Sequence, residues 1–253
     1  MKPDSLSTHG TGFCLSLSWL IAAFWLTWQA LVPVNFAYPL AYDVLHIQEH
    51  IDHYGPENRY KHGFSHTTPE ERQRLFAAIV QAIQHHGDGL RRITYSTPDG
   101  IKNTLLREPE VVHLQDVANL IDLFDVAAWI SLGISVVAVA FLAWRRLPPP
   151  GLKQIVLGLG GLLLTSGTIL LIMGPTKTFY WLHTHIFPAN HEWFFYYQDS
   201  LMTTLMKAPD LFGFIAAIWV LLALILFGLG IWGFHAGLRR LQQIPMAPGH
   251  RQT

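Results

Sequence analysis

Four stretches of the chain are apolar, carry few charges and are long enough to cross a membrane. A helix needs about 20 apolar residues to span the roughly 30 Å hydrocarbon core of a bilayer. The first stretch is not followed by a small-residue cleavage site, so we interpret it as a retained anchor and not as a signal peptide. The stretches are residues 13–34, 121–144, 152–173 and 211–232. The pattern predicts an all-α membrane protein with four transmembrane helices.

The basic residues near the ends of these stretches predict the orientation of the protein. Arg145, Arg146 and Lys153 lie between the second and third stretches, and Arg239 and Arg240 follow the fourth. Because lysine and arginine gather on the cytoplasmic side, we expect both termini in the cytoplasm and both long loops outside. The expected divisions are a tail and first helix (1–36), an extracytoplasmic cap (37–120), a second helix (121–144), a cytoplasmic loop (145–151), a third helix (152–174), an extracytoplasmic segment rich in aromatic residues and histidine (175–210), a fourth helix (211–236) and a cytoplasmic tail (237–253).

The longer outer loop, residues 37–120, contains patterns of both helix and strand. Thr68 to Glu71 form a capping box with proline at the first helical position, and apolar residues recur at helical spacing up to Ile83. Two short stretches, 92–95 and 101–106, are joined through Pro-Asp-Gly and favour a hairpin. The loop is therefore expected to form a small α+β cap.

The second membrane helix is expected to begin in water. Pro109 suits a first helical position, and the next proline is Pro148, so one helix of about 50 Å fits between them. Its first turns then place His113 above the membrane surface. Glu110 and Asp116 lie three residues to either side, within reach to orient the imidazole. The alternative is a solvated first turn whose carboxylates only complement the helix N-terminus.

The shorter outer segment, 175–210, combines aromatic rings with histidines. Such rings are typical of the lipid headgroup level. His183, His185 and His191 lie among them, so the segment is expected to be a re-entrant or interfacial loop that brings imidazoles to the same outer surface as His113. The alternative is an aromatic belt whose histidines carry no chemistry.

The composition narrows the classes of function. Lysine and arginine total 17, as do aspartate and glutamate, so the formal net charge is zero, which argues against a nucleic-acid partner. Cys14 is the single cysteine, so no intrachain disulfide forms. The sequence has no serine elbow, phosphate-binding loop or dinucleotide fingerprint. What remains is a set of histidines at an outer membrane interface, which suits general acid and base chemistry on a lipid-borne substrate with its own nucleophile.

A second hypothesis rests on His46-Ile-Gln-Glu49-His50, which has the spacing of an inverted zinc-protease motif, with His53 following on the same helical face. Zinc would need a long helix here, yet Gly55-Pro56 stops one within a turn. The alternative hypothesis is nevertheless a metal-binding or non-catalytic membrane protein that uses this cluster.

Two motifs resemble those of a known family. The string E-x-x-H-L-x-D-V at 110–117 and the segment 183–188 are similar to motifs of the family of the lipoprotein intramolecular transacylase, Lit, and the four-span layout extends the resemblance over nearly the whole chain. The resemblance implies His113 and His183 as the catalytic pair. The spacing of Glu110 and Asp116 around His113 adds these two carboxylates as supporting residues. Because the second motif departs from the family pattern, His185 is an alternative second histidine.

The resemblance also implies a reaction. The expected enzyme is an acyltransferase that moves the sn-2 acyl chain of a diacylglyceryl lipoprotein to the α-amine of its N-terminal cysteine. The product is a lyso-form lipoprotein. Together with the orientation predicted from the basic residues, the expected site is on the extracytoplasmic face of the bacterial cytoplasmic membrane, with membrane lipid around it and neither a cofactor nor a metal.

Overall fold

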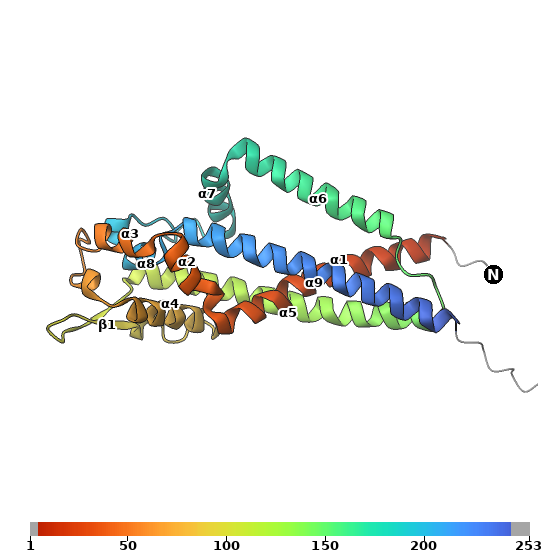
Figure 1. Cartoon of the computed structure of the whole chain (residues 1–253), viewed down its shortest axis with the longest axis horizontal. Helices are drawn as coiled ribbons and strands as arrows, with labels where there is room; N and C mark the ends of the chain where they lie inside the picture. The colour runs from red at the N-terminus through yellow and green to blue at the C-terminus, as the bar shows by residue number, and fades with distance from the viewer. Residues whose placement is uncertain (1–4, 244–253) are drawn as a thin grey trace, which may run out of the picture. The chain divides into compact units, whose positions relative to one another are not determined.

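Four long helices dominate the computed structural model, which describes residues 5–243, with the backbone alone for residues 5–9. They are α1 (Ser5–Leu31), α5 (Glu108–Trp144), α6 (Leu152–Met173) and α9 (Asp210–Gln243) (Figure 1). Each is apolar and long enough to cross a membrane, α1 together with the turns that follow it. The four predicted membrane helices are therefore present. The outermost parts of the predicted cytoplasmic ends, residues 1–4 and 244–253, lie outside the described residues.

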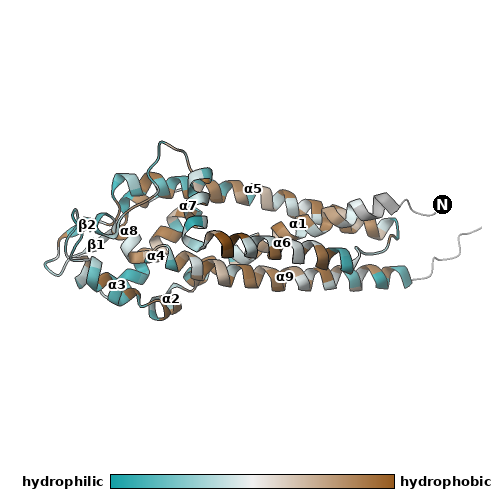
Figure 2. Cartoon of the chain, turned by 90° about the horizontal axis from the view of Figure 1, so that it is seen from above, coloured by the Kyte–Doolittle hydropathy of each residue, from teal (hydrophilic) through white to brown (hydrophobic). Residues whose placement is uncertain are grey.

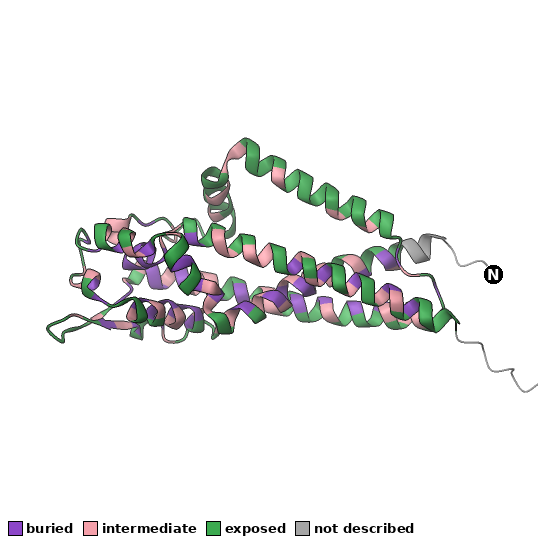
Figure 3. Ribbon diagram, viewed as in Figure 1, coloured by how far each residue is buried: buried purple, intermediate pink, exposed green. Residues whose placement is uncertain are grey.

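The chain forms two compact units, and the first contains only parts of the long helices and the loop that follows α5. It runs up to Thr27, from Val126 to Gly167 and from Val220 onward. The Oγ atoms of Ser18 and Ser135 lie 2.8 Å apart and join α1 to α5 where both side chains are buried. One apolar cluster consists of Leu15, Ala138, Leu142, Leu147 and Leu238. By contrast, α6 has no buried side chain (Figure 3), as expected of a helix whose surface faces lipid.

The second unit comprises Trp28–Asp125 and Thr168–Trp219 and holds the cap. Figure 2 shows hydrophilic residues gathered on its short elements, in contrast to the apolar long helices. These elements are η1 (Val32–Ala37), α2 (Tyr38–Val44), α3 (Ile47–Tyr54), η2 (Phe64–His66), α4 (Pro69–Gln84), η3 (Leu90–Arg92), β1 (Thr94–Ser96), β2 (Lys102–Thr104), α7 (Pro175–Ile186), η4 (Tyr197–Asp199) and α8 (Leu201–Met206). The mixture agrees with the predicted α+β cap.

The predicted cap helix is α4. The Thr68 hydroxyl accepts a hydrogen bond from the Glu71 backbone N–H at 3.2 Å, so the capping box is confirmed. The apolar stripe includes Leu75 and Ile79, both fully buried. The same helix also buries Arg72, whose guanidinium donates to Tyr42, Gln48, Ser65 and Thr67. This guanidinium ties α4 to α2 and α3.

The predicted hairpin is also present and is shorter than expected. Strands β1 and β2 pair antiparallel, with Thr94 opposite Thr104 and Ser96 opposite Lys102. The Tyr95 side chain is buried, and its hydroxyl donates to the His62 carbonyl at 2.9 Å. The hairpin is thus held to the preceding loop and ends shortly before α5 begins.

Candidate active site

Two imidazoles from distant parts of the chain lie side by side in the second unit. His113, on the second turn of α5, is 8% exposed, and His183, near the end of α7, is half-buried. Their ring centroids are 6.1 Å apart and their planes are inclined by 30°. The two histidines named by the sequence motifs are therefore neighbours, 70 residues apart in the chain.

Aromatic rings enclose this histidine pair. Phe187 and Phe195 lie with ring centroids 4.9 and 6.0 Å from that of His113. The ring centroid of Trp193 lies 5.1 Å from that of His183. The environment excludes much of the solvent, which strengthens electrostatic interactions with any polar group that enters.

The protonation state of His183 follows from its hydrogen bond. Its Nδ1 lies 2.8 Å from the backbone carbonyl oxygen of Phe179, one helical turn earlier. A carbonyl can only accept, so Nδ1 carries the proton and Nε2 keeps a free lone pair. Burial lowers the pKa of His183 below its ordinary value, against a smaller opposing effect of the Phe179 carbonyl. His183 therefore has the state that a general base requires.

His113 lacks such a fixed partner. Its Nδ1 is buried and forms no hydrogen bond with any group in the described part of the chain. A buried polar atom without a partner is costly, so a substrate atom that bonded to it would remove this cost. His113 thus offers a ring nitrogen without a partner beside the free Nε2 of His183.

His185, the alternative second histidine, lies away from His113. Its side chain is exposed, its Nδ1 lies 2.7 Å from the carbonyl oxygen of Trp181, and its ring packs on the Trp181 indole at 4.5 Å. His183 and His185 are two positions apart on one helix and therefore face different directions. The geometry favours His183 as the partner of His113.

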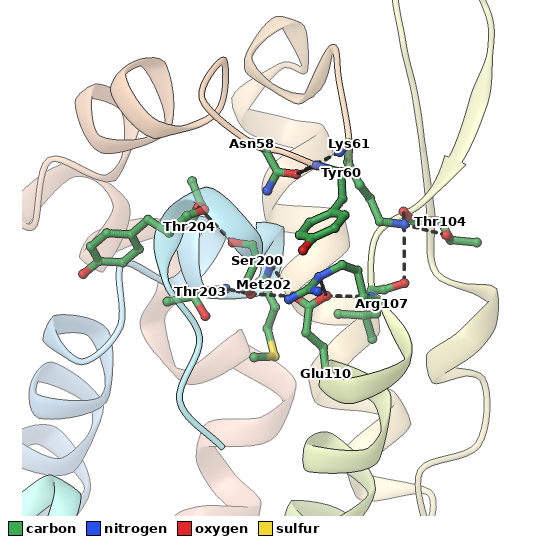
Figure 4. A network of polar contacts seen from close by, with 12 residues as sticks. Asn58, Tyr60, Lys61, Thr104, Arg107, Glu110, Ser200, Met202, Thr203 and Thr204 are labelled. Atoms are coloured by element: carbon green, nitrogen blue, oxygen red, sulfur yellow. Dashed lines mark hydrogen bonds and ion pairs between the residues drawn. The ribbon is translucent and has the colours of Figure 1, made fainter. Parts of the chain in front are cut away.

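Glu110 was expected to orient the His113 imidazole, but its carboxylate bonds to other groups. Its fully buried carboxylate accepts from the Arg107 backbone N–H at 2.6 Å, from the Ser200 hydroxyl and from the Met202 backbone N–H at 3.3 Å (Figure 4). The first of these bonds caps the N-terminus of α5, as in the alternative reading, although here the group is buried. The other two tie α5 to the start of α8, so Glu110 fixes the turn that precedes His113.

Asp116 has a different partner from the one expected. Its Oδ2 lies 2.6 Å from Nδ1 of His191, in the loop after α7. Asp116 and His191 are 75 residues apart, so no local pattern could have paired them. His191 is a site residue that the sequence motifs did not single out.

The metal hypothesis finds no support in the geometry. Within the described residues, no three histidine, cysteine, aspartate or glutamate side chains are grouped as they would be around a metal ion. His46 precedes α3 and is exposed, whereas the His50 ring packs between Tyr54 and Tyr197, with centroid distances of 4.8 and 4.4 Å. Burial lowers the pKa of His50 to about 4. Because α3 ends at Tyr54, His53 lies in its last turn, and α3 is not the long helix that a zinc site of this pattern needs.

The four helices that are long and apolar enough to cross a membrane define a membrane-integral protein, in which two imidazoles lie side by side among aromatic rings. The family model described as "Lipoprotein intramolecular transacylase Lit" matches residues 13–212. The chain belongs to this family and is an integral membrane transacylase. No curated protein sequence matches it.

Solved structures of one family member share the fold. The lipoprotein intramolecular transacylase Lit from Bacillus cereus is similar over 96% of this chain and 100% of its own, with a TM-score of 0.66 and 16% identity. Variants of that protein with a histidine replaced by arginine or by alanine have TM-scores of 0.65 and 0.59, with 16% and 18% identity, each covering 91% of both chains. At this identity the likeness concerns the fold alone.

Proposed function

We propose that the protein transfers the sn-2 acyl chain of a diacylglyceryl lipoprotein to the α-amine of that lipoprotein's N-terminal cysteine. His113 and His183 lie in the active site. The observation that carries the proposal is the 6.1 Å separation of the two imidazoles within an aromatic enclosure. Family membership supports a lipoprotein as the acyl donor. Because donor and acceptor are parts of one molecule, the site has mainly to hold them in attack geometry.

The chemistry requires a base and a hydrogen-bond donor. The neutral α-amine attacks the ester carbonyl, and Nε2 of His183 takes a proton from the attacking nitrogen. An N–H of His113 stabilises the oxyanion of the tetrahedral intermediate. As the ester C–O bond breaks, His183 returns its proton to the sn-2 oxygen. An amide and a free hydroxyl result, and no enzyme nucleophile is used.

These reaction steps require imidazoles in their neutral form. An α-amine has a pKa of roughly 7.7–8.0, so a base that is unprotonated near neutral pH can take its proton. The lowered pKa of His183 keeps it unprotonated there. The bond to the Phe179 carbonyl presents the correct nitrogen, since it holds the proton on Nδ1.

We further propose that the protein lies in the bacterial cytoplasmic membrane, with both termini inside and the histidine pair outside. The basic residues after α5 and near the end of α9 support this orientation. A reporter that is active only outside the cytoplasm, fused after Thr253, should be inactive. An active fusion would contradict the orientation.

The decisive experiment is mass spectrometry of a reporter lipoprotein produced with and without the protein. The unmutated chain should give an N-acylated, lyso-form terminus. His113→Ala and His183→Ala should each abolish it, because a base and an oxyanion donor act together. The matched control is His185→Ala, on the same helix but exposed, which should retain the product. If a folded double variant of His113 and His183 still forms the lyso product, the mechanism is wrong; if the unmutated protein never forms it, the function is wrong.

A further inference from the structure

The hydrogen bond between His191 and Asp116 joins the helix that carries His113 to the loop that encloses it. The side chains are 14% and 32% exposed, so the pair is shielded from most solvent. A carboxylate accepts, so Nδ1 of His191 carries the proton of this 2.6 Å bond. Asp116 lies on the same helix as His113 and three residues later, so the bond fixes the loop close to the catalytic imidazole.

The loop in question, residues 187–196, supplies rings to both histidines. Phe187 at its start and Phe195 near its end contact His113, and Trp193 contacts His183. His191 lies between them, and its backbone N–H donates to the Pro188 carbonyl at 3.0 Å, which forms a turn. The bond between His191 and Asp116 therefore holds the middle of the loop, while the two ends provide the enclosure.

We propose that His191 is a positioning residue, which through Asp116 holds loop 187–196 against His113 and His183. The inference rests on the proposed function for its catalytic consequence. It also explains why Asp116 does not bond to His113: its carboxylate is used to hold the loop. When the bond is removed, the loop opens, water enters, and the lipid ester is no longer held beside the two imidazoles.

Two replacements of His191, by asparagine and by glutamine, test this role, because both introduce a side-chain amide but place it at different distances from the backbone. In His191→Asn the amide nitrogen occupies the place of Nδ1 and can still donate to Asp116. In His191→Gln it occupies the place of Nε2 and cannot do so without a change of rotamer. The Gln variant should lose the bond and the Asn variant should keep it. An exposed histidine in the same unit, His66, gives the control variant His66→Gln.

The main readout is the rate at which diethyl pyrocarbonate modifies each histidine of the full-length protein in detergent, measured by mass spectrometry. His113 should react about tenfold faster in His191→Gln than in the unmutated protein, as expected from losing one hydrogen bond to a charged group. In His191→Asn and His66→Gln it should react at the original rate. Reactivity of half-buried His50 should not change, because the cap remains folded.

Kinetics with a diacylglyceryl lipopeptide provide a second readout. His191→Gln should lower kcat about tenfold, and the Asn variant should restore most of it. If His113 keeps its original labelling rate in His191→Gln, or if Asn and Gln increase it equally while His50 stays protected, the proposal is wrong. If His50 also becomes reactive in the Gln variant, Asp116→Asn, whose amide oxygen still accepts from His191, must retain the protection of His113, or the proposal is again wrong.

The labelling result separates this inference from the proposed reaction. If labelling behaves as expected while His113→Ala remains active, the loop is held as proposed and the histidine mechanism fails. If His113→Ala is inactive while His191→Gln is unchanged in both labelling and kcat, the mechanism stands and the role of His191 fails.

Discussion

Replacement of Glu110 by glutamine should destabilise the protein and lower its activity without direct loss of a catalytic group. The carboxylate is fully buried and accepts from Arg107 N, Ser200 Oγ and Met202 N, with the Arg107 Nε 3.6 Å away. Glutamine keeps the shape but presents one oxygen and one NH₂ group. At least one of the three donors then faces another donor.

The magnitude follows from these bonds. A hydrogen bond to a charged group contributes about 1.5–3 kcal/mol, and some of the loss is offset because the buried charge is also removed. We expect about 2 kcal/mol of lost stability for Glu110→Gln. For Glu110→Ala, which leaves all three donors without an acceptor, we expect about 4 kcal/mol. The matched control is Glu108→Gln, two residues earlier on the same helix, where the carboxylate is exposed and pairs with Arg91 at the surface. It should have no measurable effect.

The assay is thermal unfolding in detergent, followed by tryptophan fluorescence, together with the rate of lyso-product formation below the transition. Glu110→Gln should lower the midpoint and also kcat, because the turn that begins α5 also positions His113. Unfolding of Glu110→Gln at the same temperature as Glu108→Gln would refute the reasoning. A normal midpoint with reduced activity would instead indicate that Glu110 acts on the reaction and not on the fold.

Three further predictions concern ionisable groups in the second unit. The imidazole of His183 should titrate below pH 6.5 in NMR of the free enzyme, since burial lowers its pKa. Trp193→Ala should move this pKa back toward 6.5. A pKa above 6.5 in the unmutated protein would contradict the buried, neutral state of His183. His50, with a pKa of about 4 when folded and roughly 6.5 when unfolded, binds fewer protons in the folded state, so stability should fall as the pH falls from 6.5 toward 4. Allowing for solvent screening, about 1 kcal/mol of this dependence should disappear in His50→Phe, as measured by unfolding at the two pH values. Arg72→Met should cost about 3 kcal/mol in thermal unfolding, because four hydrogen bonds of a buried guanidinium are lost; the exposed Arg74→Met should cost about 0.5 kcal/mol, and equal costs would disprove a special role for Arg72.

The amino-acid sequence by itself determined the features that depend on local pattern. The membrane helices follow from the length of apolar stretches, and α4 follows from its capping box and the 3.6-residue recurrence of apolar side chains. The hairpin follows from the turn residues between two short stretches. Each of these is formed mainly by contacts between residues near one another in the chain.

Tertiary structure alone decided which polar groups pair across the fold. Glu110 and Asp116 are near His113 in sequence, yet they bond to Ser200 and His191, 90 and 75 residues away respectively. The helices α7 and α8 were also not predicted, because the aromatic segment has no helical repeat long enough to distinguish a helix from an interfacial loop.

The choice between His183 and His185 likewise depended on the fold. Both are near the end of α7 and both bond through Nδ1 to a carbonyl one turn earlier. Only the packing of this helix against α5 determines which imidazole faces His113. A local pattern places a residue on a helix, whereas the partner across space is set by which helix faces are buried together.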